Sequence, residues 1–164
     1  GMTQQLACSL ILSRLDYCNS LLHGAPIGVV SKLQRLQNNV ARIVTRSDRR
    51  ADAGPLLRQL HWLPVNYRIN FKIALLTYKT RTTATPFYLP TLLFAKRDTG
   101  HHLRSSASTQ LLNIPSVRTD FAARAFRVAA PSIWNSLPLT VLSSPSLSVF
   151  KSRLKTFLFS RAFD

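Results

Sequence analysis

Apolar side chains recur at helical spacing along residues 65–80, directly after Pro64. A proline suits the first turn of a helix because its missing N–H is not needed there. At 3.6 residues per turn the apolar positions form two faces instead of one. These are an aliphatic face of Val65, Ile69, Ile73 and Leu76 and an aromatic face of Tyr67, Phe71, Ala74, Leu75 and Tyr78. A helix that is apolar on two sides must be covered on two sides. The pattern therefore predicts a mainly α-helical bundle around a central helix over 65–80, with Trp62 packed at one end.

Two long helices, and a short one from Pro55 to Leu60, are predicted before the central helix. The segment from Gln4 to His23 has apolar residues at spacings of three and four and stops at Gly24, as helices often do. Its apolar face consists of Ala7, Ile11, Leu15, Cys18 and Leu22. We therefore expect Cys18 to be a reduced thiol in the core. A second helix over 27 to about 46 has the apolar face Leu33, Leu36, Val40, Ile43 and Val44.

The chain after the central helix is predicted to be less regular. Thr80 to Thr83 indicates a turn, and Pro86 to Phe94 a short apolar helix. Residues 96–109 are polar and predict a hinge. We therefore expect a helical bundle over 1–95 and a small, irregular C-terminal unit over 110–164.

Within this C-terminal unit, residues 110–114 and 117–119 could pair as a short β-hairpin. Trp134 is expected in a short helix that Pro138 closes. Ser144 and Pro145 then begin a terminal amphipathic helix, with Ser144 as its cap. Its apolar stripe consists of Leu147, Phe150, Leu154, Phe157 and Leu158.

The charge of the chain points to an anionic partner. The sequence has 22 Lys and Arg against 6 Asp, no Glu and a net charge of +16, with a pI of about 11.4. Arginine predominates, and its planar guanidinium binds phosphate through two parallel donors. We expect a nucleic acid as the partner, ahead of an anionic membrane surface. No apolar run approaches membrane-spanning length, so we expect no membrane partner. The alternative is a solvated surface that happens to be basic.

One helix carries its cations on a single face. The residues Lys32, Arg35, Asn39, Arg42 and Arg46 recur at spacings of three and four, and we call them the basic face. Arg49 and Arg50 extend it, and Arg68 and Lys72 of the central helix are expected to assist it. Cations in such a row suit a phosphate backbone, with an affinity that falls as salt rises. A solvated helix face is the alternative, although such faces usually mix both signs.

A second basic cluster lies near the C-terminus. Arg118, Arg124 and Arg127 are interleaved with Phe121 and Phe126. Arginines beside aromatic rings can hold single-stranded nucleic acid by charge and stacking together. The alternative is that both phenylalanines belong to the core.

The acidic residues do not form a catalytic pattern. Asp48 and Asp52 are the only acids at helical spacing, and a two-metal or acid–base site would need them in a concave, partly desolvated place. They lie among arginines, so we expect them to satisfy those arginines instead. Cys8 and Cys18 lack metal-site spacing, and adjacent histidines such as His101 and His102 point apart. We predict no catalytic residue, no metal site and no cofactor in this chain.

Several motifs resemble one protein family. The motifs are SRLDYCNSLL (13–22), KLQRLQNNVAR (32–42), LHWLPV (60–65), RI-x-F-K (68–72), LTYK (76–79), PFYL (86–89), LRSS (103–106), RAFRVAAPSIWNSLP (124–138) and SSPSLSVFKSRLKTFLF (143–159). In this order they resemble the region downstream of the palm in LINE-type, non-LTR retrotransposon reverse transcriptases of the jockey-like group. The resemblance spans nearly the whole chain.

The resemblance implies a C-terminal part of an RNA-directed DNA polymerase, in which residues 1–95 would correspond to a thumb-like bundle. The parent enzyme nicks target DNA and copies element RNA from the nick. It needs paired carboxylates and Mg²⁺, in the family a Tyr/Phe-x-Asp-Asp motif, and no two acids are adjacent here. Mg²⁺ is therefore expected only for the parent polymerase, and this chain alone is not expected to be an enzyme.

The expected function is a non-catalytic segment that grips template RNA or an RNA–DNA hybrid through the basic face. Target DNA and the remainder of the parent polymerase are further expected partners. The resemblance implies an intracellular location, in a nuclear or cytoplasmic ribonucleoprotein of the parent element. One alternative is a structural module that docks on the missing polymerase core. Another is a relic open reading frame of a dead element, without a cellular role.

Overall fold

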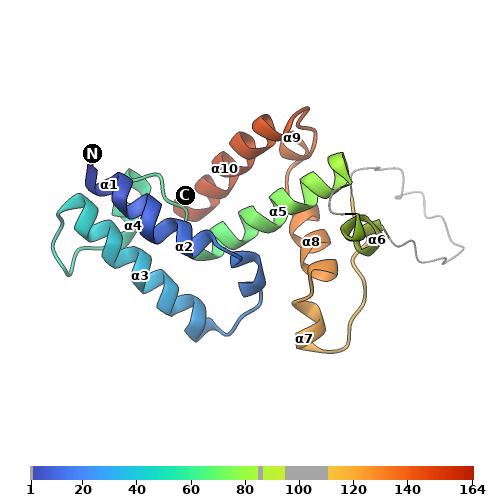
Figure 1. Ribbon diagram of the computed structural model, residues 1–164, viewed down its shortest axis with the longest axis horizontal. Helices are drawn as coiled ribbons and strands as arrows, with labels where there is room; N and C mark the ends of the chain where they lie inside the picture. Colours follow the sequence, from blue (N-terminus) through green and yellow to red (C-terminus); the bar gives the residue numbers. More distant parts are fainter. Residues whose placement is uncertain (1, 85–86, 95–110) are drawn as a thin grey trace, which may run out of the picture. The chain divides into compact units, whose positions relative to one another are not determined.

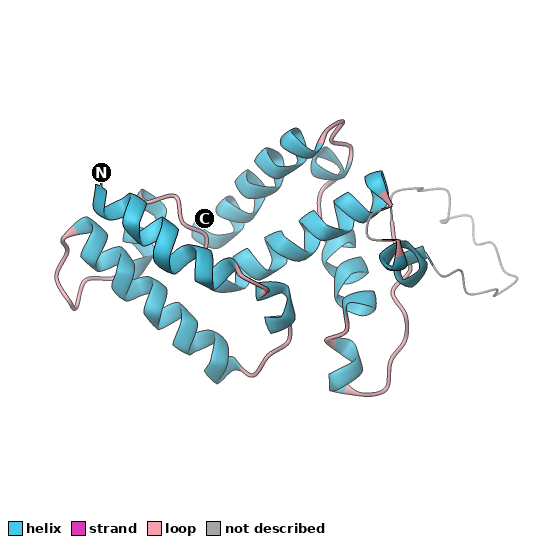
Figure 2. Cartoon of the chain, viewed as in Figure 1, coloured by secondary structure: helices cyan, strands magenta, loops and turns pink. Residues whose placement is uncertain are grey.

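The computed structural model describes residues 2–84, 87–94 and 111–164, except for the side chains of Leu92 and Phe94. Over these residues the chain forms helices joined by loops and turns, with no strand (Figures 1 and 2). The predicted mainly α-helical class is confirmed. None of the helices in this part of the chain combines the length and apolar character needed to cross a membrane.

The contacts divide the chain into two units. Unit 1 comprises 1–72 and 155–164, and unit 2 comprises 73–154. Two long helices, α5 (Val65–Thr83) and α10 (Leu147–Phe163), contribute one part to each unit. The predicted hinge at 96–109 lies outside the described residues. The observed division falls within α5 and within α10, because the two ends of each helix belong to different units.

Unit 1 is built on α3, against which α1 and α4 pack (Figure 1). Its elements before α5 are α1 (Met2–Ala7), a π-helical turn (Cys8–Leu12), α2 (Ser13–Asp16), a 3-10 turn (Asn19–Leu22), α3 (Ile27–Thr45) and α4 (Ala53–Gln59). The buried core of the unit consists of Ala7, Leu12, Leu15, Val40, Ala41, Leu57 and Trp62. Trp62 is 5% exposed, so the predicted packing of the indole in the bundle is confirmed.

The first predicted helix is interrupted. Tyr17 is extended and Cys18 is left-handed with φ 51°, so the helical run that begins at Met2 stops at Asp16. The break exposes Cys18 and buries Asn19, which is 2% exposed. The expectation of a core thiol at Cys18 is therefore wrong. The apolar spacing continues through Cys18, although the helix itself ends before it.

Unit 2 is organised around an aromatic stack. It contains α6 (Tyr88–Phe94), α7 (Asp120–Ala123), α8 (Phe126–Asn135) and α9 (Leu139–Leu142), besides its parts of α5 and α10. The ring of Phe150 on α10 is fully buried and stacks on Tyr78 of α5 at 4.2 Å between centroids. Trp134 of α8 stacks on the same ring at 5.8 Å. Three helices far apart in sequence are thus joined through one phenylalanine, and Trp134 lies in the predicted short helix.

The region of the predicted hairpin contains no strand over its described residues, 111–119. The side chain of Asn135 takes the place of a partner strand. Its amide nitrogen donates to the Leu112 carbonyl at 2.8 Å, and its amide oxygen accepts from the Leu112 N–H at 2.9 Å. The backbone groups of Leu112 are therefore satisfied by α8, and Leu112 is buried.

Two helix boundaries differ from those expected. The central helix continues through Thr83 instead of turning after residue 80, and the hydroxyls of Thr80 and Thr82 donate to carbonyls one turn earlier. At the start of α10 the cap is Ser146, whose Oγ accepts from the Val149 N–H at 3.3 Å. Ser144 is buried instead, and its hydroxyl donates to the Val141 carbonyl.

Candidate nucleic-acid interface

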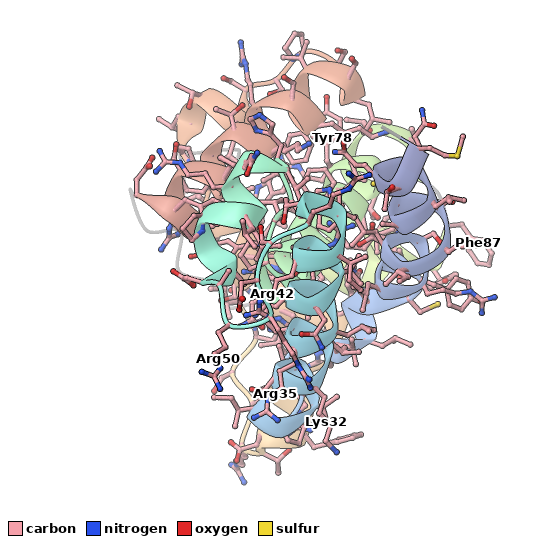
Figure 3. The ribbon with its side chains drawn as sticks, turned by 90° about the vertical axis from the view of Figure 1, so that its left-hand side faces the viewer. Lys32, Arg35, Arg42, Arg50, Tyr78 and Phe87 are labelled. Carbon is pink, nitrogen blue, oxygen red and sulfur yellow. The ribbon has the colours of Figure 1, made fainter. Side chains whose placement is uncertain are left out.

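The basic face lies on the solvent side of α3. Lys32, Arg35 and Asn39 are exposed along the helix, and Figure 3 labels Lys32, Arg35 and Arg42 on it. The opposite side of α3 buries Val40 and Ala41 in the core of unit 1. Packing on one side of the helix therefore fixes which side presents the cations.

Arg42 differs from its neighbours because its guanidinium is already bonded. Its Nε donates to the Ala51 carbonyl at 2.9 Å, and its Nη1 donates to Asn39 Oδ1 at 3.1 Å. The side chain is half-buried. Arg42 thus holds the segment after α3 against the helix, while its remaining donors stay on the basic face.

The segment 46–52 continues the positive charge beyond the helix. Arg46 closes α3 in a left-handed conformation, and the following Ser47 N–H donates to the Arg42 carbonyl at 3.0 Å. Arg46, Arg49 and Arg50 are all exposed, and Figure 3 labels Arg50 on this segment. The end of α3 and the turn after it thus present three more guanidinium groups to solvent.

Asp48 and Asp52 do not pair with these arginines. Asp48 Oδ1 accepts from the backbone N–H of Arg50 at 2.7 Å, and Asp52 Oδ1 caps α4 by accepting from the Gly54 N–H at 3.1 Å. The expectation that they satisfy arginine side chains is therefore wrong, since short acidic side chains in turns bond the backbone two residues on. The guanidinium groups of this segment are left without an acidic partner among the described residues.

Two further predicted residues lie on α5. The Arg68 guanidinium binds Asp16 through two bonds, with Nε to Oδ1 at 2.8 Å, and only 15% of its side chain is exposed. Arg68 therefore joins α2 to α5 and is not a free cation, contrary to its assignment as an assisting residue. Lys72 is half-buried on the same helix.

The outer side of α3 also carries exposed apolar residues, and two of them, Leu36 and Ile43, belong to the apolar face predicted from the sequence. Val29, Leu36 and Ile43 follow at intervals of seven, which keeps them on one side of a helix. All three are exposed, Ile43 to 67%. The basic face is thus bordered by an exposed aliphatic line. The interval of seven shows that these residues share one side of the helix, but the same interval is also typical of a buried stripe, so it does not predict their exposure.

The second basic cluster lies in unit 2. Arg118, Arg124 and Arg127 are exposed around the short helix α7. Phe121 on that helix is 85% exposed, whereas Phe126 is half-buried. The alternative that both phenylalanines belong to the core is therefore wrong for Phe121.

No group of three His, Cys, Asp or Glu side chains that could hold a metal occurs within residues 2–84, 87–94 and 111–164. His101 and His102 lie outside these ranges. Cys8 and Cys18 are both exposed thiols. Comparisons of the chain with protein-family models, curated proteins and solved structures found no match.

Proposed function

We propose that this chain is a non-catalytic nucleic-acid-binding segment of a retrotransposon reverse transcriptase. In this proposal the basic face of α3 and the arginines of 46–52 hold the backbone of template RNA or of an RNA–DNA hybrid. The family assignment rests on the motifs that resemble LINE-type polymerases. The binding role rests on the geometry of α3.

The observation that supports the binding role is a set of exposed, unneutralised cations on one helix side and on the turn that follows. Lys32, Arg35, Arg46, Arg49 and Arg50 are exposed, and none of them has an acidic partner among the described residues. Exposed charges that do not pair within the protein are available to phosphates, and each phosphate contact releases counterions. A helix side of this kind follows a backbone without reading its sequence.

A salt titration tests the proposal. Binding to matched single-stranded RNA, RNA–DNA hybrid and duplex DNA is measured from low to high salt. For a backbone held by four or more cations, the logarithm of the affinity falls with the logarithm of salt with a slope of about −3 to −4. A clear preference for RNA or hybrid supports the template role, and a shallow slope or indifference to the nucleic acid contradicts it.

Two variants with equal charge changes locate the contact. The first reverses Arg35, Arg46 and Arg50 to Glu, and the second reverses three exposed lysines elsewhere, Lys79, Lys151 and Lys155. The first variant is expected to reduce the slope by about one for each residue changed. The second should alter binding only slightly. Equal losses in both variants would mean that the total charge, and not the basic face, governs binding.

A second candidate function is a docking module for the polymerase core. The exposed aliphatic line of Val29, Leu36 and Ile43 favours it, because three aligned apolar side chains in water gain free energy when a partner covers them. Replacing Leu36 and Ile43 by Ser separates the two functions. Lower self-association with unchanged RNA binding assigns the line to protein docking, whereas weaker RNA binding places it within the nucleic-acid interface.

A further inference from the structure

Phe121 is a large aromatic side chain that the fold leaves in water. It lies on α7, a single helical turn from Asp120 to Ala123, and 85% of it is exposed. The turn is ordered by its own bonds. Thr119 Oγ1 accepts from the Ala122 N–H at 3.2 Å, and the Arg124 N–H donates to the Phe121 carbonyl at 3.2 Å. The ring is therefore displayed on a capped turn and contributes little to the core.

Arginines surround this ring in the sequence and share its exposure. Arg118, Arg124 and Arg127 are exposed, and none forms an ion pair among the described residues. Arg124 follows Phe121 by three residues, which places the two side chains on neighbouring positions of a helical turn. Asp120 is the only acid between 111 and 127. The patch thus combines one aromatic face with an excess of positive charge.

The combination restricts the ligand that fits. A purely apolar partner would leave three guanidinium groups unused, and a duplex would offer phosphates but keep its bases stacked inside. Unpaired nucleotides offer a phosphate and a free base face together. We infer that Arg118, Phe121, Arg124 and Arg127 form a binding site for single-stranded nucleic acid, in which a base stacks on Phe121. The inference rests on the proposed nucleic-acid function, but its residues belong to unit 2, whereas the basic face belongs to unit 1.

Stacking on Phe121 can be observed directly in the whole 164-residue chain. The two natural tryptophans are buried, Trp62 in unit 1 and Trp134 in unit 2. A Phe121→Trp variant therefore adds an exposed indole whose fluorescence reports on a stacked base. Phe87→Trp is the matched control, because Phe87 is 86% exposed and residues 84–94 contain no Lys or Arg. Single-stranded RNA is expected to quench the indole at 121 strongly and the one at 87 weakly.

An abasic RNA strand separates stacking from charge. It has the same phosphates as the normal strand but no bases. For the wild-type chain we expect tighter binding to the normal strand, and for Phe121→Ala a loss of about 5- to 150-fold on that strand alone. The salt slope should stay unchanged in Phe121→Ala, and Phe87→Ala should bind as the wild type does.

Three results would overturn the inference. They are unchanged binding by Phe121→Ala, equal losses on normal and abasic strands, and quenching at 121 by anionic lipid vesicles in place of RNA. The test also separates this site from the basic face. Reversal of Arg35, Arg46 and Arg50 should reduce the salt slope but keep the preference for the normal over the abasic strand. Loss of the preference for the normal strand with an unchanged salt slope therefore indicates loss of stacking on Phe121. A reduced salt slope with an unchanged preference indicates loss of the contacts of the basic face.

Discussion

The side chain of Gln37, which is fully buried on α3, donates from Nε2 to the carbonyl of Leu63 at 2.9 Å. Its neighbour Gln34 accepts from the N–H of Val65, the first residue of α5, at 2.8 Å. Pro64, which precedes α5, has no side-chain acceptor to cap the helix. A glutamine pair on α3 therefore satisfies the backbone where α5 begins.

Replacing Gln37 by Ala is expected to reduce the free energy of unfolding by about 1–3 kcal/mol, because the buried Leu63 carbonyl loses its donor. Urea unfolding followed by far-UV circular dichroism measures the change. Arg35→Ala, an exposed substitution on the same helix, is the control and should stay within about 0.5 kcal/mol of the wild type. A similar stability of both variants would show that water replaces the glutamine.

The Asp16–Arg68 pair should couple α2 to α5. Arg68 is largely buried, so removing Asp16 alone leaves a buried positive charge without its acidic partner. Removing both residues leaves no such charge. A double-mutant cycle with Asp16→Asn and Arg68→Met is expected to give a coupling energy of about 1–2 kcal/mol. A coupling near zero would mean that the two groups are solvated independently. The pair Arg58–Asp164, exposed on both sides, is the control and should couple by less than about 0.5 kcal/mol.

Substitutions in the aromatic stack of unit 2 should reduce the free energy of unfolding by different amounts at Tyr78 and at Phe150. Tyr78→Phe keeps the ring but removes the hydroxyl that donates to the Ser144 carbonyl at 3.0 Å, so we expect a loss of about 1 kcal/mol. Phe150→Ala removes the central ring and should cost about 3–5 kcal/mol. Thermal unfolding with near-UV circular dichroism measures both. A small effect at Phe150 would contradict its place in the core.

Protonation of His23 should destabilise the fold. Burial lowers the pKa of His23 below its ordinary value of 6.5. The unfolded chain therefore binds the proton first as pH falls, and stability decreases from about pH 6.5 downward to the folded pKa. Urea titrations at pH 7.5 and 5.5 should show this loss in the wild type and a smaller one in His23→Gln.

The assignment to His23 fails if His23→Gln and the wild type lose the same free energy between the two pH values.

Local sequence patterns predicted several of the helices. Apolar spacing predicted the span of α3 and the buried Phe150 and Leu154 stripe of α10, and Pro64 together with two apolar faces predicted the start of α5. These features depend on interactions within one helix and on burial of its apolar faces, both of which the amino-acid order encodes.

Tertiary contacts decided the features that the sequence could not predict. Gln37 has the polarity of a surface residue, yet it is buried and bonded to the Leu63 carbonyl. This partner lies 26 residues away in the sequence, so local patterns do not reveal it. Periodicity alone predicted that the first helix continues through Cys18. In the structure the helix ends at Asp16, whose carboxylate binds Arg68 of α5. For the candidate interface, the positions of Lys32 and Arg35 were predictable from spacing. The exposure of Phe121 was not, because an aromatic residue among arginines fits a core and a binding surface equally well in sequence.

Arg42 is predicted to contribute to both stability and binding, because its guanidinium holds the Ala51 carbonyl while lying on the basic face. Arg42→Ala should reduce the free energy of unfolding by about 1–2 kcal/mol and also the salt slope of RNA binding by about one. Arg42→Lys keeps the charge but loses the planar donor set, so it should bind with the wild-type slope and unfold more easily. Arg35→Ala should lose affinity without losing stability, since its side chain is exposed. Equal stability of Arg42→Lys and the wild type would show that the 46–52 segment is held by other contacts.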